Sequence, residues 1–209
     1  MIGIDRDVTD GGVVADLADP DARREAIATV AHALGGIDVL VNCAGVWSAG
    51  GIANSSPAQW RALWSVDLEA PLDLVRLAAE HMAGPAWVVM VTSIHAHATQ
   101  PESVAYAVAK AGLEAATRAA AIDLAPRGIL VNAVAPGFVH TRMSVLEDGV
   151  DETETAAFRT IYVDGGRLPL RRSADAVEIA APTAFLASRD NTYITGAVLA
   201  VDGGLSATF

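Results

Sequence analysis

Tyr106 and Lys110 are the residues of this sequence whose types and spacing most clearly suggest chemistry, and they lie four positions apart in the run VAYAVAK. In a helix, that spacing places the phenol and the ammonium group side by side on one face. A neighbouring positive charge favours the phenolate, and lowering a tyrosine pKa from about 10 to neutrality takes roughly 4 kcal/mol. Such a pair can move a proton to or from a carbonyl or alcohol oxygen. Taken alone, the same spacing also occurs in surface pairs that have no chemical role.

Ser93 is the third candidate, because its hydroxyl group can bond the same substrate oxygen. It lies thirteen residues before Tyr106, just after an apolar run at 87–91 that has the composition of a buried strand. A polar loop then leads into the helix, which begins near Ser103 and ends near Ala125. The predicted strand and helix would therefore bring a hydroxyl, a phenol and an ammonium group to one place.

The elements around this pair alternate between strands and helices. Apolar runs predict six short strands, at 2–4, 12–15, 37–41, 87–91, 129–134 and 197–201. Helical patterns occupy about 20–34, 57–82, 103–125 and 174–187, with Pro71 and Pro182 expected to mark kinks. The order predicts an α/β fold with an open, mostly parallel sheet.

Polar and small residues follow several of these strands at their carboxyl ends. In open α/β sheets, ligands bind in the crevice beyond those ends. The pattern therefore predicts one shared ligand crevice, formed by Asp5, Asp16, Asn42, Gly45, Ser93, Pro136 and Gly137.

The stretch 138–172 is irregular and charged, and a segment of this kind in a compact domain is typical of a lid or binding loop. We expect it to cover the crevice and to determine the substrate. Its acidic residues are Glu147, Asp148, Asp151, Glu152 and Glu154.

Length and composition indicate one domain spanning residues 1–209, with a core of small aliphatic residues. The net charge of -11 argues against a nucleic-acid partner. Cys43 is the only cysteine, which excludes a disulfide and a thiolate metal site, and we expect no bound metal. No apolar run is long enough for a membrane span, and the first residues do not resemble a signal peptide, so we expect a cytoplasmic protein.

Taken together, the motifs resemble those of the classical short-chain dehydrogenase/reductase family, in order and spacing over nearly the whole chain. This resemblance implies a Rossmann-like, doubly wound fold and hydride transfer between NAD(H) or NADP(H) and a carbonyl or alcohol. It also implies a homodimer or homotetramer, paired through the two long helices beside the 87–91 strand. The motifs are Asn42-Cys43-Ala44-Gly45, Ser93, Tyr106-x3-Lys110, Pro136-Gly137-x3-Thr141, Thr195-Gly196 and Val201-Asp202-Gly203-Gly204.

The resemblance also implies a role for each residue that matches a family motif. Tyr106 would be the acid/base, Ser93 would orient and polarise the substrate oxygen, and Lys110 would bind the nicotinamide ribose and depress the pKa of Tyr106. The implied cofactor contacts are Asp5 on the adenosine ribose hydroxyls, Asp16 and Leu17 at the adenine, Asn42, Ala44 and Gly45 beside the adenosine ribose, and Pro136, Gly137, Val139 and Thr141 at the nicotinamide carboxamide. The acid at position 5 disfavours a 2′-phosphate and so favours NAD over NADP, although Arg6 weakens that preference.

The sequence departs from the family pattern in two places. Asp67 stands where the family has a fourth catalytic residue, an asparagine, so a charge replaces an amide. The family's first strand, glycine-rich turn and helix have no counterpart, because the chain starts at the second strand and contains no Gly-x-x-x-Gly-x-Gly. We therefore expect an incomplete domain with a gap where the missing strand would lie. Either the Ile2 strand pairs with the Ile37 strand, or another chain fills the gap, or the Ile2 strand stays loosely attached.

Three hypotheses follow. The first is an NAD(P)-dependent oxidoreductase that uses Ser93, Tyr106 and Lys110. The second is a degenerate relative that binds a partner or small molecule without redox chemistry, supported by Asp67 and the missing turn. The third is a lyase, epimerase or cyclase that uses the tyrosine and lysine for proton transfer alone.

His95, His97 and Trp47 are further candidates for the substrate pocket.

Overall fold

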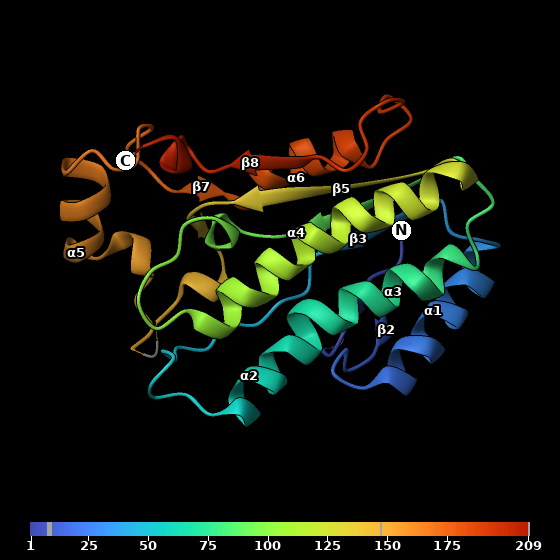
Figure 1. Ribbon diagram of the computed structural model, residues 1–209, viewed down its shortest axis with the longest axis horizontal. Helices are drawn as coiled ribbons and strands as arrows, with labels where there is room; N and C mark the ends of the chain where they lie inside the picture. The colour runs from blue at the N-terminus through green and yellow to red at the C-terminus, as the bar shows by residue number, and fades with distance from the viewer. Residues whose placement is uncertain (8–9, 147, 209) are drawn as a thin grey trace.

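The computed structural model describes residues 1–7, 10–146 and 148–208, and it shows an α/β fold whose strand pairs are all parallel (Figure 1). This confirms the predicted Rossmann-like fold with about six strands. The main sheet has the order β3-β4-β5-β8, with bounds Val39–Asn42, Ala86–Val91, Ile129–Pro136 and Val198–Val201. Two further pairs of very short strands are β1 (Ile4–Asp5) with β2 (Val13–Val14), and β6 (Val139–His140) with β7 (Ala174–Asp175).

The first two strands do not join the main sheet. Ile4 pairs with Val13, and within the described residues no strand lies along the free edge of β3. The structure thus contradicts one of the three expected arrangements, the pairing of the Ile2 strand with the Ile37 strand, and pairs β1 with β2 instead. Val39 and Val41 on β3 are 41% and 40% exposed. Apolar strand residues are usually buried on both faces of a parallel sheet, so this edge is unusually open.

Four helices cover one face of the main sheet (Figure 1). They are α1 (Pro20–Leu34), α2 (Pro57–Trp64), α3 (Ala70–Ala79) and α4 (Val104–Leu124). The Asp19 side chain accepts a hydrogen bond from the Asp21 N–H, and Gly35 ends α1 in the left-handed conformation, as the sequence predicts. The main core forms where α3 and α4 meet the sheet, and it includes Leu74, Ala78, Val88, Leu113 and Val131.

The opposite face carries α6 (Ala176–Leu186), which contains Pro182. A second, smaller core lies here, where Leu186 packs with Val89 and Val134 of the sheet. The alternation of side chains along the strands explains the two cores, because Val88 points to one face and Val89 to the other. Within the described residues, no helix is both long and apolar enough to cross a membrane.

The predicted helix through Pro71 is continuous but changes its winding between α2 and α3. Residues 65–69 form a π-helical turn directly before Pro71, which has no N–H to donate to the preceding turn of the helix. Turns of this kind are rare and frequently occur at functional sites. Here the turn contains Asp67, which is fully buried.

The segment 138–172 is folded into short elements rather than being irregular. It contains β6, a helical turn α5 (Ala156–Phe158) and several other single turns, and it forms the end of the molecule to which the main strands point (Figure 1). Phe138, Phe158 and Tyr162 pack together with ring centroids 4.6–4.9 Å apart. Glu147, one of the acids expected in this segment, lies outside the described residues.

A hydrogen-bonded network around His140 joins β6 to later residues of the chain. His140 Nδ1 lies 3.1 Å from Asp151 Oδ2, and His140 Nε2 lies 2.5 Å from Ser173 Oγ. The connectivity is that of a serine hydrolase triad, but His140, Asp151 and Ser173 do not line the large cavity that holds Ser93. The network therefore fastens β6 to Asp151 and Ser173, which follow His140 by 11 and 33 positions.

Candidate active site

Ser93 lies just beyond the carboxyl end of β4, as predicted. Its side chain accepts a hydrogen bond from the His95 N–H at 3.2 Å and so caps the short 3₁₀ turn Ile94–Ala96. The Ser93 residue is 7% exposed. This cap fixes the position of the hydroxyl group at the edge where the sheet ends.

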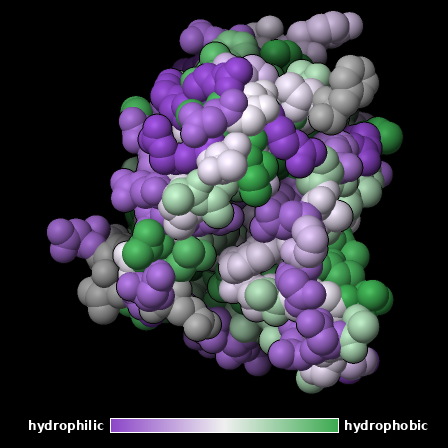
Figure 2. Space-filling view, turned by 90° about the vertical axis from the view of Figure 1, so that its left-hand side faces the viewer, coloured by the Kyte–Doolittle hydropathy of each residue, from purple (hydrophilic) through white to green (hydrophobic). Residues whose placement is uncertain are grey.

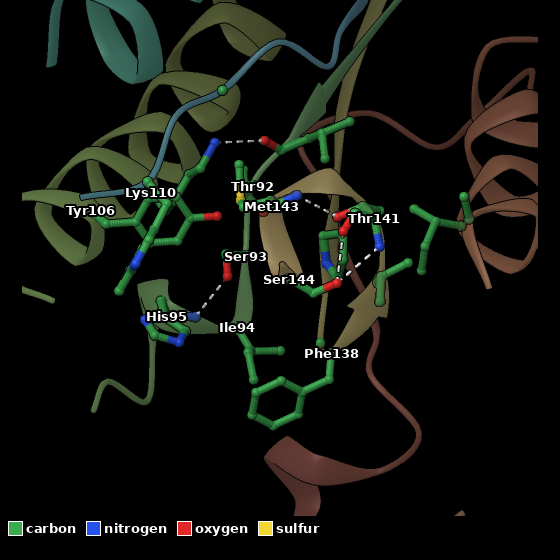
Figure 3. Close-up of a pocket in the computed structure, with 18 of the residues that line it drawn as sticks. Thr92, Ser93, Ile94, His95, Tyr106, Lys110, Phe138, Thr141, Met143 and Ser144 are labelled. Atoms are coloured by element: carbon green, nitrogen blue, oxygen red, sulfur yellow. Dashed lines mark hydrogen bonds between the residues drawn. The ribbon is translucent and has the colours of Figure 1, made fainter. Parts of the chain in front are cut away.

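Tyr106 and Lys110 lie one turn apart near the start of α4, and both are buried. Lys110 Nζ is 5.3 Å from the centre of the Tyr106 ring and donates a hydrogen bond to the Val91 carbonyl oxygen at 3.3 Å. Figure 3 shows the phenol oxygen pointing into the space between Lys110 and the strand that carries Ser93. The structure thus brings together the three groups that the sequence singled out.

Asp67 forms a buried ion pair with Lys110. Its Oδ2 is 3.1 Å from Lys110 Nζ, and its Oδ1 accepts a hydrogen bond from the Val46 N–H at 2.8 Å. Gly112 allows this approach, because a Cβ atom at that position would lie 3.1 Å from Leu68 on the turn that carries Asp67. The ammonium group therefore has a buried counter-charge.

The electrostatics of the site differ from the simple expectation for Tyr106. Burial raises the pKa of Tyr106 above its usual value, and the Asp67 carboxylate raises it further, while Lys110 and the Ser93 hydroxyl lower it. Lys110 thus acts in the predicted direction, but burial outweighs it and the net shift of the pKa is upward. Burial likewise raises the pKa of Asp67, against the opposing effect of Lys110.

The three groups open into one large cavity at the carboxyl ends of the strands. Its volume is about 840 Å³, and Figure 2 shows the surface hollowed at this end of the molecule. The segment 138–172 lies beside it and contributes Thr141, Met143 and Leu146 to its wall. The predicted site residues that line the cavity are Gly45, Ser93, Tyr106, Lys110, Pro136, Gly137, Val139 and Thr141.

Comparisons with known proteins agree with this arrangement. The family model described as "Enoyl-(Acyl carrier protein) reductase" matches residues 4–206. The chain belongs to the short-chain dehydrogenase/reductase family. It is 33% identical over 194 residues to an acetoacetyl-CoA reductase of Allochromatium vinosum, covering 91% of this chain and 75% of that one.

Two solved structures are also similar to this chain. Aldohexose dehydrogenase of Thermoplasma acidophilum, in ligand-free form, has a TM-score of 0.89 and 29% identity, covering 100% of this chain and 84% of that one. A blue fluorescent protein from a metagenomic library, in complex with NADPH, has a TM-score of 0.84 and 31% identity, covering 93% and 75%. The fold of a short-chain dehydrogenase/reductase is thus shared over almost the whole chain.

Five residues expected at the adenosine half of a short-chain dehydrogenase/reductase site do not line the cavity. The Leu17 side chain is buried in the main core, and its carbonyl oxygen accepts a hydrogen bond from the Arg23 side chain. The Asn42 side chain is also buried, and its Nδ2 donates a hydrogen bond to the Pro71 carbonyl oxygen at 3.3 Å, joining β3 to α3. The other three are exposed: Asp5, Asp16 and Ala44.

The residues present fit the nicotinamide half of a dinucleotide. Gly45 and Gly137 have no side chain that would narrow this part of the cavity, and a Cβ atom on Gly137 would lie 2.9 Å from Asp202. Lys110, Ser93 and Thr141 supply polar groups around the same space. The described residues contain no cluster of His, Cys, Asp and Glu that would hold a metal ion.

Sequence reasoning missed part of the cavity wall. Ile179, Ala180 and Thr183 of α6 line it. The α6 residues are uniformly apolar or small, so their sequence indicates a packing helix and gives no sign of a ligand.

Proposed function

We propose that this chain transfers a hydride between a nicotinamide dinucleotide and a carbonyl or alcohol substrate, with Tyr106 as the acid/base. The observation that carries the proposal is the convergence of Ser93, Tyr106 and Lys110 on one cavity that also contains Thr141. Two-electron chemistry at a carbonyl carbon needs a proton at the oxygen and a hydride at the carbon. The nicotinamide would supply or accept the hydride when bound.

The protein's own groups bind the substrate oxygen and exchange a proton with it. In reduction, Tyr106 gives its proton to the carbonyl oxygen, and in oxidation it accepts the alcohol proton. Ser93 holds the same oxygen by a hydrogen bond, and Lys110 stabilises the phenolate that forms. The raised pKa of Tyr106 keeps the phenol protonated at neutral pH, which suits the direction of reduction.

The cofactor is proposed to be NAD in preference to NADP. Asp5 is the last residue of β1, and its Oδ1 already accepts a hydrogen bond from the Asp7 N–H, which holds the carboxylate at the end of that strand. A carboxylate there bonds ribose hydroxyls and repels a 2′-phosphate. Residues 138–172 would act as the substrate lid of a single domain.

A homodimer or homotetramer is proposed, through the outer faces of α3 and α4. Leu72 on α3 is 42% exposed, and Val108 and Ile122 on α4 are 47% and 74% exposed. Apolar side chains in this number on adjacent helices are typical of a surface that another subunit covers.

The experiment is a titration with NADH followed by fluorescence, repeated with NADPH and with Lys110→Ala. Binding that Lys110→Ala abolishes supports the proposal, because the lysine would bond the nicotinamide ribose. No binding of either dinucleotide at millimolar concentration would refute it for this polypeptide. Asp123→Asn, exposed near the C-terminal end of α4, serves as the control variant.

A binding protein without redox chemistry is the second candidate. The observation in its favour is Asp67, which neutralises Lys110 at 3.1 Å and opposes formation of the phenolate. Small-molecule binding that persists in Tyr106→Phe, with no turnover by the wild-type protein, would favour this candidate. A lyase, epimerase or cyclase would instead show turnover without any dinucleotide.

A further inference from the structure

Three aromatic rings form a box beside the reacting groups. The ring centroids of Trp47 and Tyr106 are 5.1 Å apart, those of His95 and Tyr106 are 5.6 Å apart, and those of Trp47 and His95 are 5.9 Å apart. All three contacts are edge to face, and all three residues line the cavity. This geometry holds the imidazole of His95 in a fixed position next to the phenol (Figure 3).

The imidazole is a polar group without a partner. Among residues 1–7, 10–146 and 148–208, neither ring nitrogen of His95 makes a hydrogen bond, and Nδ1 is buried. Burial also lowers the pKa of His95, so the ring is neutral at pH 7 and has one N–H donor and one acceptor nitrogen. Nδ1 has no accessible surface, so Nε2, which also lacks a partner among these residues, is the nitrogen that a ligand in the cavity can bond.

The rest of this part of the cavity wall is mainly apolar. Ile94, Phe138, Met143 and Leu146 surround the space in front of Ser93 and Tyr106. Lys110 is already paired with Asp67, and Arg142 at the rim lies 3.3 Å from Asp7, so both cations near the cavity have carboxylate partners. The wall therefore fits an uncharged hydrocarbon framework better than an anionic one.

We propose that His95 binds a second oxygen of the substrate, on the carbon next to the reacting one, so that the substrate class is an uncharged vicinal diol or α-hydroxyketone on an apolar framework. His95 is joined to Ser93 through the cap that positions the serine, so the imidazole and the hydroxyl group keep a fixed spacing. Oxygens on adjacent carbon atoms are close enough to contact the phenol and the imidazole at once. In oxidation, the alcohol proton goes to Tyr106 and the hydride to the nicotinamide, while the second oxygen stays bonded to His95.

The proposal rests on the proposed oxidoreductase function, and matched substrates test it. We would measure kcat/KM with NAD for two pairs: cyclohexanol against cyclohexane-1,2-diol, as separate cis and trans isomers, and 1-phenylethanol against 1-phenylethane-1,2-diol. The wild-type protein should prefer a diol by about 10-fold or more, because a site built to bond a hydroxyl group rejects the analogue that lacks it.

His95→Phe keeps an aromatic ring in the box and removes both nitrogens, so it should abolish most of the diol preference with less effect on the simple alcohols. His95→Gln, which retains a donor and an acceptor, should restore part of it. His97→Gln is the matched control, because His97 lies two residues further on, is 60% exposed and bonds Glu114. This control should leave the preference unchanged.

The outcomes separate the two proposals. If neither NADH nor NADPH binds, the oxidoreductase function fails. If the cofactor binds but the diols are not oxidised, or are oxidised no better than the simple alcohols, the substrate class is overturned. A diol preference that persists in His95→Phe overturns the role of His95.

Discussion

Replacing Asp67 by asparagine removes a buried negative charge beside the catalytic pair while keeping the size of the side chain. The carboxylate is 3.1 Å from Lys110 Nζ, which is itself 5.3 Å from the centre of the Tyr106 ring. The carboxylate and the phenol ring are therefore at most about 8 Å apart. At an effective dielectric constant near 20, two charges at that distance repel by about 2 kcal/mol.

The sign of the effect follows from the structure. Asp67 raises the pKa of Tyr106, so its removal lowers that pKa and leaves the Lys110 charge free to stabilise the phenolate. About 2 kcal/mol corresponds to roughly a 30-fold change in the ionisation equilibrium. For alcohol oxidation, which needs the phenolate, the rise of kcat/KM with pH should begin more than one pH unit lower in Asp67→Asn. For carbonyl reduction, which needs the phenol, activity should be lost at a correspondingly lower pH.

The assay is a pH profile of kcat/KM in both directions, read from nicotinamide absorbance. Asp123→Asn removes the same charge at the C-terminal end of α4, where the side chain is exposed, and it should not move the profile. Thermal unfolding checks that Asp67→Asn stays folded, since a buried lysine without its partner costs several kcal/mol. An unchanged profile in a folded Asp67→Asn protein would refute the reasoning, because Asp67 would then carry a proton and exert no field.

Three further results are expected. Tyr106→Phe should lower kcat by about 100-fold or more while NADH affinity changes little, measured by steady-state kinetics and fluorescence titration, because only the acid/base group is lost. Ser173→Ala removes the hydroxyl partner of His140 Nε2 and should lower the free energy of unfolding in urea by about 1 kcal/mol. Asp19→Ala removes the side chain that accepts from the Asp21 N–H at the start of α1 and should lower Tm by about 2–4 °C in a thermal scan, while Asp19→Asn, which keeps an acceptor, should not.

Much of the fold follows from local signals in the sequence. The Asp19-Pro20 start of α1 and the Ser56-Pro57 start of α2 were predictable, because capping and proline preferences act within one turn. The strands β3, β4, β5 and β8 were also predictable from their apolar runs. Which strand pairs with which depends on contacts distant in the sequence, so the sequence left three arrangements of the Ile2 strand open. The structure contradicts its pairing with the Ile37 strand, because β1 pairs with β2 and leaves the edge of β3 open.

The segment 138–172 shows the limit of composition as a guide. Its charges and glycines predicted an irregular lid, whereas the structure has short turns fastened by His140, Asp151 and Ser173. These residues are 11 and 33 positions from His140 in the sequence, so no local pattern joins them. A network of this kind forms only when the chain has already been brought together.

The sequence by itself determined the chemical groups of the site and their order, because Ser93, Tyr106 and Lys110 each lie at a position that a strand end or a helical turn defines. Only the tertiary structure decided how these groups behave. The packing of the π-helical turn against Gly112 brings Asp67 to Lys110, and the burial of Tyr106 raises its pKa. Solvation and charge proximity depend on all the elements that surround a group, and spacing along one chain does not encode them.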